Sequence, residues 1–214
     1  AFIDEAAIQC GFCTPGFIMT AVELLETGRE YTDDELRKLL SGHLCRCTGY
    51  QNIFRAVNST LIYLERGDEY LMLHRTKKEH DMNEGKWIGV GGGLEEGESP
   101  EDGALREVRE ETGYTMLSWR YRGIVTFVSD VCEGEYMHLF TCDRFDGEEI
   151  VCDEGDLAWI KKEDLPSLPS WEGDRVFLNL LAQERPFFSL KLIYHGDALA
   201  SAVLDGKPLP LHSV

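Results

Sequence analysis

Residues 91–114 read GGGLEEGESPEDGALREVREETGY, a glycine-rich opening followed by an acidic segment. The carboxylates of that segment recur at Glu107, Glu110 and Glu111. In a helix these positions, i, i+3 and i+4, lie on one face, where like charges repel one another. A bound cation would relieve the repulsion, and oxygen ligands suit Mg²⁺ or Mn²⁺. The stretch therefore predicts a helix that presents a divalent-metal site.

The start of this helix is marked by Ser99, followed by Pro100 and Asp102. Serine is a favoured N-cap residue, and proline is favoured at the first helical position. Leu105 and Val108 are expected to form the buried stripe of the helix. Arg106 can hold a carboxylate with both arms of its guanidinium group and so fix the ligand set.

From Gly92 onward the spacing is G-x₅-E-x₇-R-E-V-x-E-E-x-G-Y, which resembles the Nudix box at every position. The resemblance implies a metal-assisted attack of water on a diphosphate linkage in a nucleotide. It assigns Glu107 and Glu111 to the metal, Glu110 to the metal or to the role of base, and the Gly91 carbonyl to the metal. The alternative, a solvated acidic helix, does not require the glycines before and after it. The matched residues are Gly92, Glu98, Arg106, Glu107, Val108, Glu110, Glu111, Gly113 and Tyr114.

Three residues outside the box extend the resemblance to MutT-like Nudix enzymes. Glu154 matches an extra metal-binding carboxylate of that group; alternatively it is a solvated loop acid. Trp171 and Asp174 resemble a purine-recognition segment, in which the indole stacks on the base and the acid binds its edge; alternatively Trp171 packs under a helix. Together with Gly92, they are the expected substrate-binding residues. The chain departs from the enzyme that carries this segment at two positions. Ile88, after Trp87, stands where that enzyme has Asn, and Gly173 stands where it has a second acid.

Composition limits the possible functions. The chain has 214 residues, of which 43% are hydrophobic and 28% charged, with a formal net charge of −18. This charge argues against binding a nucleic-acid polymer, which requires basic patches, but it permits a small nucleotide accompanied by metal ions. No apolar run approaches the roughly 20 residues that span a bilayer, so we expect no membrane partner. With no signal-peptide pattern, we expect a cytoplasmic location.

Four cysteines define a second site near the start of the chain, in a region that reads as helical. Cys10 and Cys13 form a C-x-x-C pair, and Cys45 and Cys47 form a C-x-C pair. Four thiolates suit either zinc or a [2Fe–2S] cluster. The alternative is four buried free cysteines, but close pairs flanked by glycine are not typical of core cysteines.

The segments QCGFCTPGFIMTAVELL and GHLCRCTGYQNIFRAV resemble the helical [2Fe–2S] domain of the molybdenum hydroxylase family, in the small subunits of xanthine and carbon monoxide dehydrogenases. The resemblance implies that all four cysteines ligate one cluster and that Gln9 lies near a pterin cofactor. It also implies a molybdopterin-containing subunit as partner. The chain departs from the family because it contains no plant-type C-x₄-C-x₂-C motif.

Alternating hydrophobic runs from residue 58 onward predict strands, ending in a terminal hairpin. We therefore expect an α+β protein with two domains. Residues 1–57 would form an all-helical, partial [2Fe–2S] domain, and residues 58–214 an α/β/α Nudix sandwich with a mixed sheet. The expected activity is Mg²⁺-dependent pyrophosphohydrolysis of a nucleoside triphosphate, with 8-oxo-dGTP as a candidate. The alternative function is an electron-transfer module of a xanthine, aldehyde or carbon monoxide dehydrogenase-type oxidoreductase.

Overall fold

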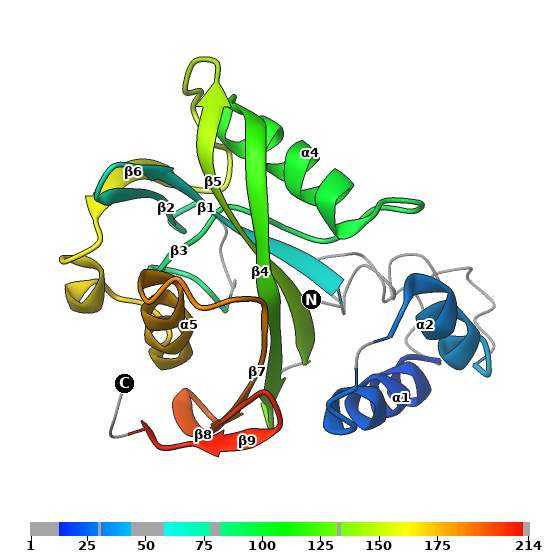
Figure 1. Cartoon of the computed structure of the whole chain (residues 1–214). Coiled ribbons are helices and arrows are strands. Elements are labelled where there is room, and N and C mark those ends of the chain that lie inside the picture. Colours follow the sequence, from blue (N-terminus) through cyan, green and yellow to red (C-terminus); the bar gives the residue numbers. More distant parts are fainter. Residues whose placement is uncertain (1–12, 30, 44–57, 78–81, 132–133, 212–214) are drawn as a thin grey trace.

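The computed structural model describes residues 13–29, 31–43, 58–77, 82–131 and 134–211, which form an α+β protein (Figure 1). Its helices are α1 (Thr14–Glu26), α2 (Asp33–Leu40), α4 (Pro100–Thr112) and α5 (Glu172–Ala182), with the 3₁₀ turn η1 (Leu165–Ser167). Its strands are β1 (Asn58–Arg66), β2 (Glu69–His74), β3 (Trp87–Ile88), β4 (Thr115–Ser129), β5 (Glu135–Asp146), β6 (Asp156–Lys161), β7 (Phe188–His195), β8 (Ala198–Leu204) and β9 (Lys207–Leu209).

The strands join in one mixed sheet with the order β3-β2-β1-β5-β4-β7-β8-β9, and β6 pairs with β2 outside this path. The pairs β1–β5 and β4–β7 are parallel, and the other pairs are antiparallel. A turn joins β1 to β2, and Gly67 adopts a positive φ of 62° there. The predicted terminal hairpin is confirmed as the antiparallel pair β7–β8, to which β9 adds a further antiparallel strand.

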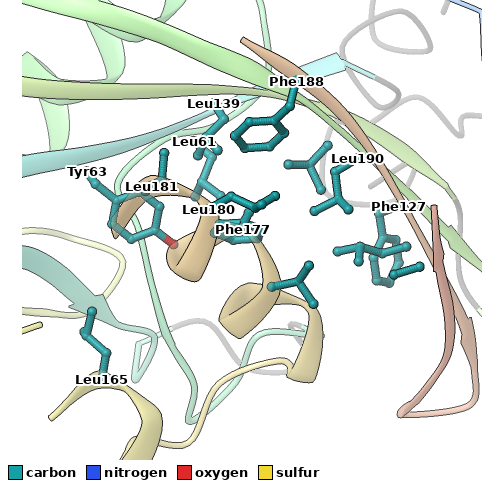
Figure 2. Close-up of a cluster of buried hydrophobic side chains, with 14 of the residues drawn as sticks. Leu61, Tyr63, Phe127, Leu139, Leu165, Phe177, Leu180, Leu181, Phe188 and Leu190 are labelled. Carbon is teal, nitrogen blue, oxygen red and sulfur yellow. The ribbon is translucent and has the colours of Figure 1, made fainter. Parts of the chain in front are cut away.

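Helices α4 and α5 cover opposite faces of the sheet, as the alternation of side chains along β1 requires. Leu61 and Tyr63 belong to the cluster that includes α5, whereas Ile62 and Leu64 belong to the cluster that includes α4. Figure 2 shows the first cluster, in which Phe177 of α5 is fully buried beneath the strands. Burying one such side chain contributes about 1.5–3 kcal/mol. The predicted sandwich is therefore confirmed.

Helix α4 begins as the sequence predicts. Ser99 is the N-cap, its hydroxyl accepts a hydrogen bond from the Asp102 amide, and the Asp102 side chain accepts one from the Ser99 amide. The predicted stripe is confirmed, because Val108 is fully buried and Leu105 is partly buried against the same hydrophobic cluster, which the fully buried Ala104 also joins. Positions i, i+3 and i+4 lie on one face of a helix, so all three residues share the inner face.

The two N-terminal helices also follow the prediction. The Thr32 hydroxyl accepts from the Glu35 amide, and the Glu35 carboxylate accepts from the Thr32 amide, which forms a capping box at the start of α2. Leu24 of α1 and Leu36 of α2 pack with Leu94, which lies in the loop before α4. The rest of the region that is expected to be helical, residues 44–57, lies outside the described residues. In the part of the chain that the structure describes, no helix is both long and apolar enough to cross a membrane.

Candidate active site

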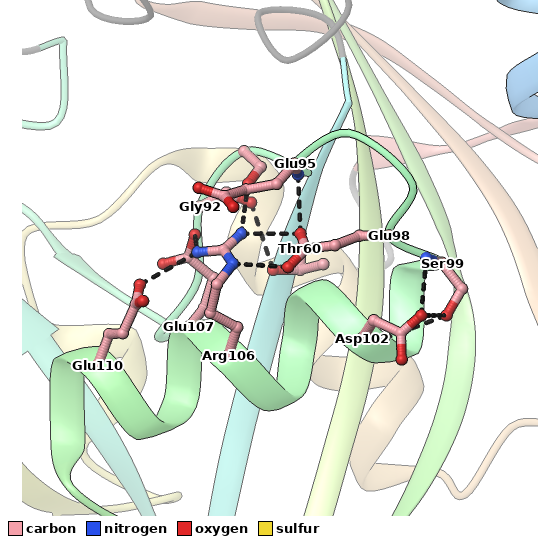
Figure 3. A network of polar contacts seen from close by, with 10 residues as sticks. Thr60, Gly92, Glu95, Glu98, Ser99, Asp102, Arg106, Glu107 and Glu110 are labelled. Atoms are coloured by element: carbon pink, nitrogen blue, oxygen red, sulfur yellow. Dashed lines mark hydrogen bonds and ion pairs between the residues drawn. The ribbon is translucent and has the colours of Figure 1, made fainter.

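Arg106 is the centre of the polar network on α4 (Figure 3). Its guanidinium group binds Glu98 with both arms, through Nε–Oε1 at 2.7 Å and Nη2–Oε2 at 3.0 Å. It also donates to Glu107 at 2.6 Å, to Glu110 at 3.1 Å and to the Gly93 carbonyl at 2.9 Å. The predicted bidentate contact of Arg106 is confirmed, and its partner is Glu98. These bonds attach the glycine-rich loop to the helix.

The three box carboxylates differ in burial. The Glu107 side chain is 13% exposed and Glu111 is 7% exposed, whereas the Glu110 side chain is 61% exposed. Burial raises the pKa of Glu107 above its usual range, and the hydrogen bond from Arg106 offsets part of this effect. Glu107 and Glu111 therefore form the inner part of the site, and Glu110 stands at its rim.

The glycine-rich loop fits closely against β1 and α4. The Gly91 amide donates to Glu111 at 2.9 Å, and its φ of 147° is one that residues with a side chain rarely adopt. A Cβ atom on Gly91 would lie 2.1 Å from the Thr60 carbonyl oxygen. A Cβ atom on Gly92 would lie 2.8 Å from a carboxylate oxygen of Glu107. Glycine is thus needed so that the backbone can approach both buried carboxylates.

This donor set fits a hard divalent cation. Buried carboxylates are costly unless a cation accompanies them, and Mg²⁺ and Mn²⁺ prefer oxygen ligands. Among the described residues, no three His, Cys, Asp or Glu side chains are already gathered closely enough to hold a metal ion. Glu107 and Glu111 are the residues that would hold it, and the Arg106 contact to Glu107 would have to adjust.

Glu154 lies in a loop beside the box, but its carboxylate forms an ion pair with the buried Arg75. The same loop contains Cys152, whose thiol pKa is raised by burial and also by the nearby Glu111 carboxylate. Lys77 holds this loop through a 2.7 Å hydrogen bond to the Cys152 carbonyl. The loop is therefore close to the acidic face of α4, but Glu154 would have to leave Arg75 to reach a metal ion there, and its metal role remains a prediction.

A pocket opens on the α5 side of the sheet, with about 550 Å³ of empty space when its open mouth is included. Trp171 and Asp174, the two predicted base-recognition residues, both line it. Ile88 lines it as well, so the position where the sequence departs from the MutT-like segment contributes an apolar wall. The structure thus brings Trp171 and Asp174 together in one pocket.

Asp174 has an unusual environment for a carboxylate. Burial raises its pKa to about 7, against the opposing effects of a hydrogen bond from the Trp171 backbone and the positive charge of Lys86. Burial is the main cause that raises the pKa values of Tyr63 and Tyr194, and the nearby Asp174 charge adds to it. Near neutral pH the Asp174 carboxyl group therefore exists in both protonation states. The protonated form can donate a hydrogen bond, whereas the ionised form can only accept one.

This environment makes stability depend on pH. Between about pH 4 and pH 7 the folded protein holds a proton on Asp174 that the unfolded chain has lost. The free energy of unfolding of the wild type should therefore fall with rising pH, by on the order of 2–4 kcal/mol relative to Asp174→Asn, and level off above pH 7. Urea unfolding at several pH values measures this difference.

Asp205→Asn is a suitable control for that measurement. Hydrogen bonding to the Ser189 amide lowers the pKa of Asp205, so its contribution to stability is lost only as the pH falls below about 4. Equal pH dependence of the wild type and Asp174→Asn between pH 4 and 7 would contradict the prediction.

Sequence reasoning missed two residues at this pocket, Asn83 and Lys86. Asn83 accepts a 2.8 Å hydrogen bond from the indole Nε1 of Trp171, and the Lys86 ammonium lies 4.1 Å from the centre of the Trp171 ring. Both lie in a polar turn before β3 that matches no motif, and no periodicity in the sequence connects it with a tryptophan more than 80 residues away. The sequence also assigned no role to Glu98, although it matches the box.

The fold and the acidic site together define a Nudix protein. The NUDIX domain family matches residues 55–181, and the chain belongs to this family. The uncharacterised Nudix hydrolase YvcI of Bacillus subtilis is 30% identical over 125 residues, covering 55% of this chain and 74% of that protein. The crystal structure of the mutator MutT protein from Bacillus halodurans is 26% identical, with a TM-score of 0.62, over 71% of this chain and 99% of its own.

The first part of the chain matches a different family, the [2Fe-2S] binding domain, over residues 1–58. The nicotine 6-hydroxylase small subunit of Paenarthrobacter nicotinovorans is 58% identical over 57 residues, which cover 27% of this chain. The chain spans about a third (34%) of the length of that relative. Cys13 lies at the N-cap of α1, whereas Cys10, Cys45 and Cys47, together with Gln9, lie outside the described residues.

Proposed function

We propose that the chain is a metal-dependent pyrophosphohydrolase that cleaves a nucleoside triphosphate to the monophosphate and pyrophosphate. The observation that carries the proposal is the pairing of an intact acidic site on α4 with a pocket that contains Trp171 and Asp174. An oxidised purine nucleotide such as 8-oxo-dGTP is the candidate substrate, because an aromatic platform beside a hydrogen-bonding acid suits a purine. We place the working domain at residues 58–214.

In this proposal, Glu107 and Glu111 hold Mg²⁺ or Mn²⁺, with the Gly91 carbonyl and Glu154 as further ligands. The metal would supply charge neutralisation for the diphosphate and a lowered pKa for the attacking water. Glu110, at the exposed rim, is placed to ligate or to accept the proton of that water. Arg106 keeps the acids in place by binding Glu98 and Glu107 at once. Gly92 gives the phosphates close access to the backbone.

The separation between the base pocket and the acidic site of α4 supports a nucleotide as the substrate. Ile88 lines the base pocket, and four residues later a Cβ atom on Gly92 would lie 2.8 Å from a carboxylate oxygen of Glu107. Four residues span at most about 14 Å, which is comparable to the reach of a nucleotide from its base to its terminal phosphates. In this proposal the base lies at Trp171 on the α5 side of the sheet, and the phosphates reach the acids of α4 along residues 88–92, which border both.

The test is a nucleotide panel with Mg²⁺: dGTP, 8-oxo-dGTP, 2-oxo-dATP, ADP-ribose and dinucleoside polyphosphates. We expect pyrophosphate and a monophosphate from the triphosphates, fastest for an oxidised purine, and no product after chelation of the metal. Orthophosphate in place of pyrophosphate would contradict the proposed cleavage site. Faster hydrolysis of ADP-ribose than of any triphosphate would contradict the proposed substrate class.

We propose a second function, electron transfer through a [2Fe–2S] cluster, because the match over residues 1–58 is to a cluster-binding domain. Cys10, Cys13, Cys45 and Cys47 would ligate the cluster, within a domain of residues 1–57. Such a module would exchange electrons with a molybdopterin-containing subunit. Visible absorption, iron and acid-labile sulfide, measured on the same sample as the nucleotide panel, test this proposal. A colourless protein that contains zinc would overturn it.

A further inference from the structure

We propose that Asn83 and Lys86 are positioning residues that fix the Trp171 ring so that one of its faces is open to a purine base. The inference rests on the proposed function, since it concerns the base of the nucleotide substrate. It adds a specificity-determining element, the turn formed by residues 82–86, to a pocket otherwise built by the sheet and α5.

The turn and the Trp171 segment are connected at three points. The Trp171 Nε1–H donates to the Asn83 side-chain oxygen at 2.8 Å. The Lys86 ammonium lies over the indole, 4.1 Å from its centre. The Trp87 amide donates to the Pro169 carbonyl at 2.8 Å, which ties the start of β3 to the residues before Trp171. A hydrogen bond at the ring edge and a cation at the ring face together restrict both side-chain torsions of Trp171.

Lys86 lies over one face of the indole, with its ammonium 4.1 Å from the ring centre. Trp171 and Asn83 line the pocket, whereas Lys86 is not among its lining residues. The ammonium is held in this position by a 3.1 Å hydrogen bond to the Met82 carbonyl. The indole is therefore held by a cation at one face and by T-shaped contacts with Tyr194 and Phe127, and it borders the pocket in which the proposed base would stack.

Two backbone hydrogen bonds fix the turn of residues 82–86 to Arg75. The Arg75 amide donates to the Lys86 carbonyl at 3.0 Å, and the Gly85 amide donates to the Arg75 carbonyl at 2.8 Å. These two bonds close the turn onto the end of β2. The Trp171 ring is thus held in place before a ligand binds, so less side-chain entropy is lost on binding.

The experiment compares Lys86→Met, which keeps the aliphatic stem and removes the charge, with Lys86→Arg, which keeps a cation over the ring. Asn83→Leu removes the acceptor for the indole, and Asn83→Asp retains it. Lys161→Met is the matched control, because Lys161 is an exposed lysine on β6, away from Trp171. Binding of dGMP is followed through the NMR signal of the Trp171 indole N–H, and KM and kcat are measured with dGTP and with deoxyribose 5′-triphosphate, which lacks a base.

Lys86→Met and Asn83→Leu should each weaken dGMP binding and raise KM for dGTP by about tenfold, with kcat changed less than threefold. Lys86→Arg and Asn83→Asp should restore most of the loss. KM for deoxyribose 5′-triphosphate should not change. The indole N–H of Trp171 should exchange with water at least about tenfold faster in Asn83→Leu.

The results of this experiment distinguish a failure of the positioning role from a failure of the proposed hydrolysis. If the wild type binds dGMP at Trp171 but cleaves no triphosphate, the proposed hydrolysis is wrong and the positioning role is decided by the dGMP affinities. If Lys86→Met and Asn83→Leu bind dGMP as tightly as the wild type, the positioning role is wrong. A wild type whose Trp171 signal does not respond to dGMP also overturns it, as does an equal rise in KM for the substrate without a base.

Discussion

Glu111→Gln should slow pyrophosphate release by roughly a thousandfold, the largest effect we expect on activity. Glu111 is 7% exposed, and its carboxylate accepts the Gly91 amide hydrogen at 2.9 Å. Glutamine preserves this acceptor and the shape of the side chain but removes the charge that the metal requires. Losing several kcal/mol of transition-state stabilisation corresponds to a factor of ten for each 1.4 kcal/mol.

A second measurement shows that this loss arises from metal binding and not from unfolding. Mg²⁺ or Mn²⁺ should raise the unfolding temperature of the wild type, since a ligand that binds only the folded state stabilises it. The same ions should leave Glu111→Gln unchanged. Glu148→Gln, at an exposed loop acid, is the control and should behave as the wild type in both assays. Activity of Glu111→Gln within threefold of the wild type would refute the assignment of Glu111 to the metal.

Gly91→Ala should produce the largest loss of stability, about 3 kcal/mol or more. The backbone at Gly91 has a φ of 147°, and a Cβ atom would lie 2.1 Å from the Thr60 carbonyl oxygen of β1. That atom belongs to the backbone of the sheet and cannot move without breaking the contact between β1 and the loop. Activity should fall as well, because the Gly91 amide binds Glu111.

The Gly97→Ala variant separates the steric clash of an added Cβ atom from the cost of the left-handed backbone conformation. Gly97 also has a positive φ, of 82°, but a Cβ atom there would meet nothing within 4 Å. We expect a loss of only about 1–2 kcal/mol at Gly97, from the left-handed conformation alone. Urea unfolding measures both variants. Equal midpoints for Gly91→Ala and Gly97→Ala would show that the close approach to Thr60 has no energetic consequence.

Local chemistry made much of the catalytic region predictable. The cap of α4 was predicted from Ser99 and Asp102, since capping involves residues three apart in the chain. The bidentate contact of Arg106 was predicted, but its partner Glu98 was not, because the glycine loop between them can bring several acids within reach. The buried face of α4 was predicted from Leu105 and Val108, and the structure adds Ala104, which the sheet beneath the helix covers completely.

The features of the site that could not be predicted depend on contacts between residues that are distant in the sequence. Trp171 and Asp174 were identified as candidates for base recognition, but their environment depends on Asn83 and Lys86 in a turn that carries no motif. Glu154 was expected at the metal, yet its carboxylate pairs with Arg75. In each case the decisive partner comes from another strand or loop, so neither periodicity nor spacing along the chain reveals it.

By itself, then, the sequence determined the acidic helix and the glycine loop within residues 91–114 and the presence of strands from residue 58 onward, because these depend on local geometry and on alternating hydrophobicity. Only the tertiary structure decided which of the carboxylates are buried. Glu107 and Glu111 are enclosed by the loop and the sheet while Glu110 remains at the rim. It also decided that the turn before β3 supports Trp171, since packing across the sheet brings together segments that no local rule connects.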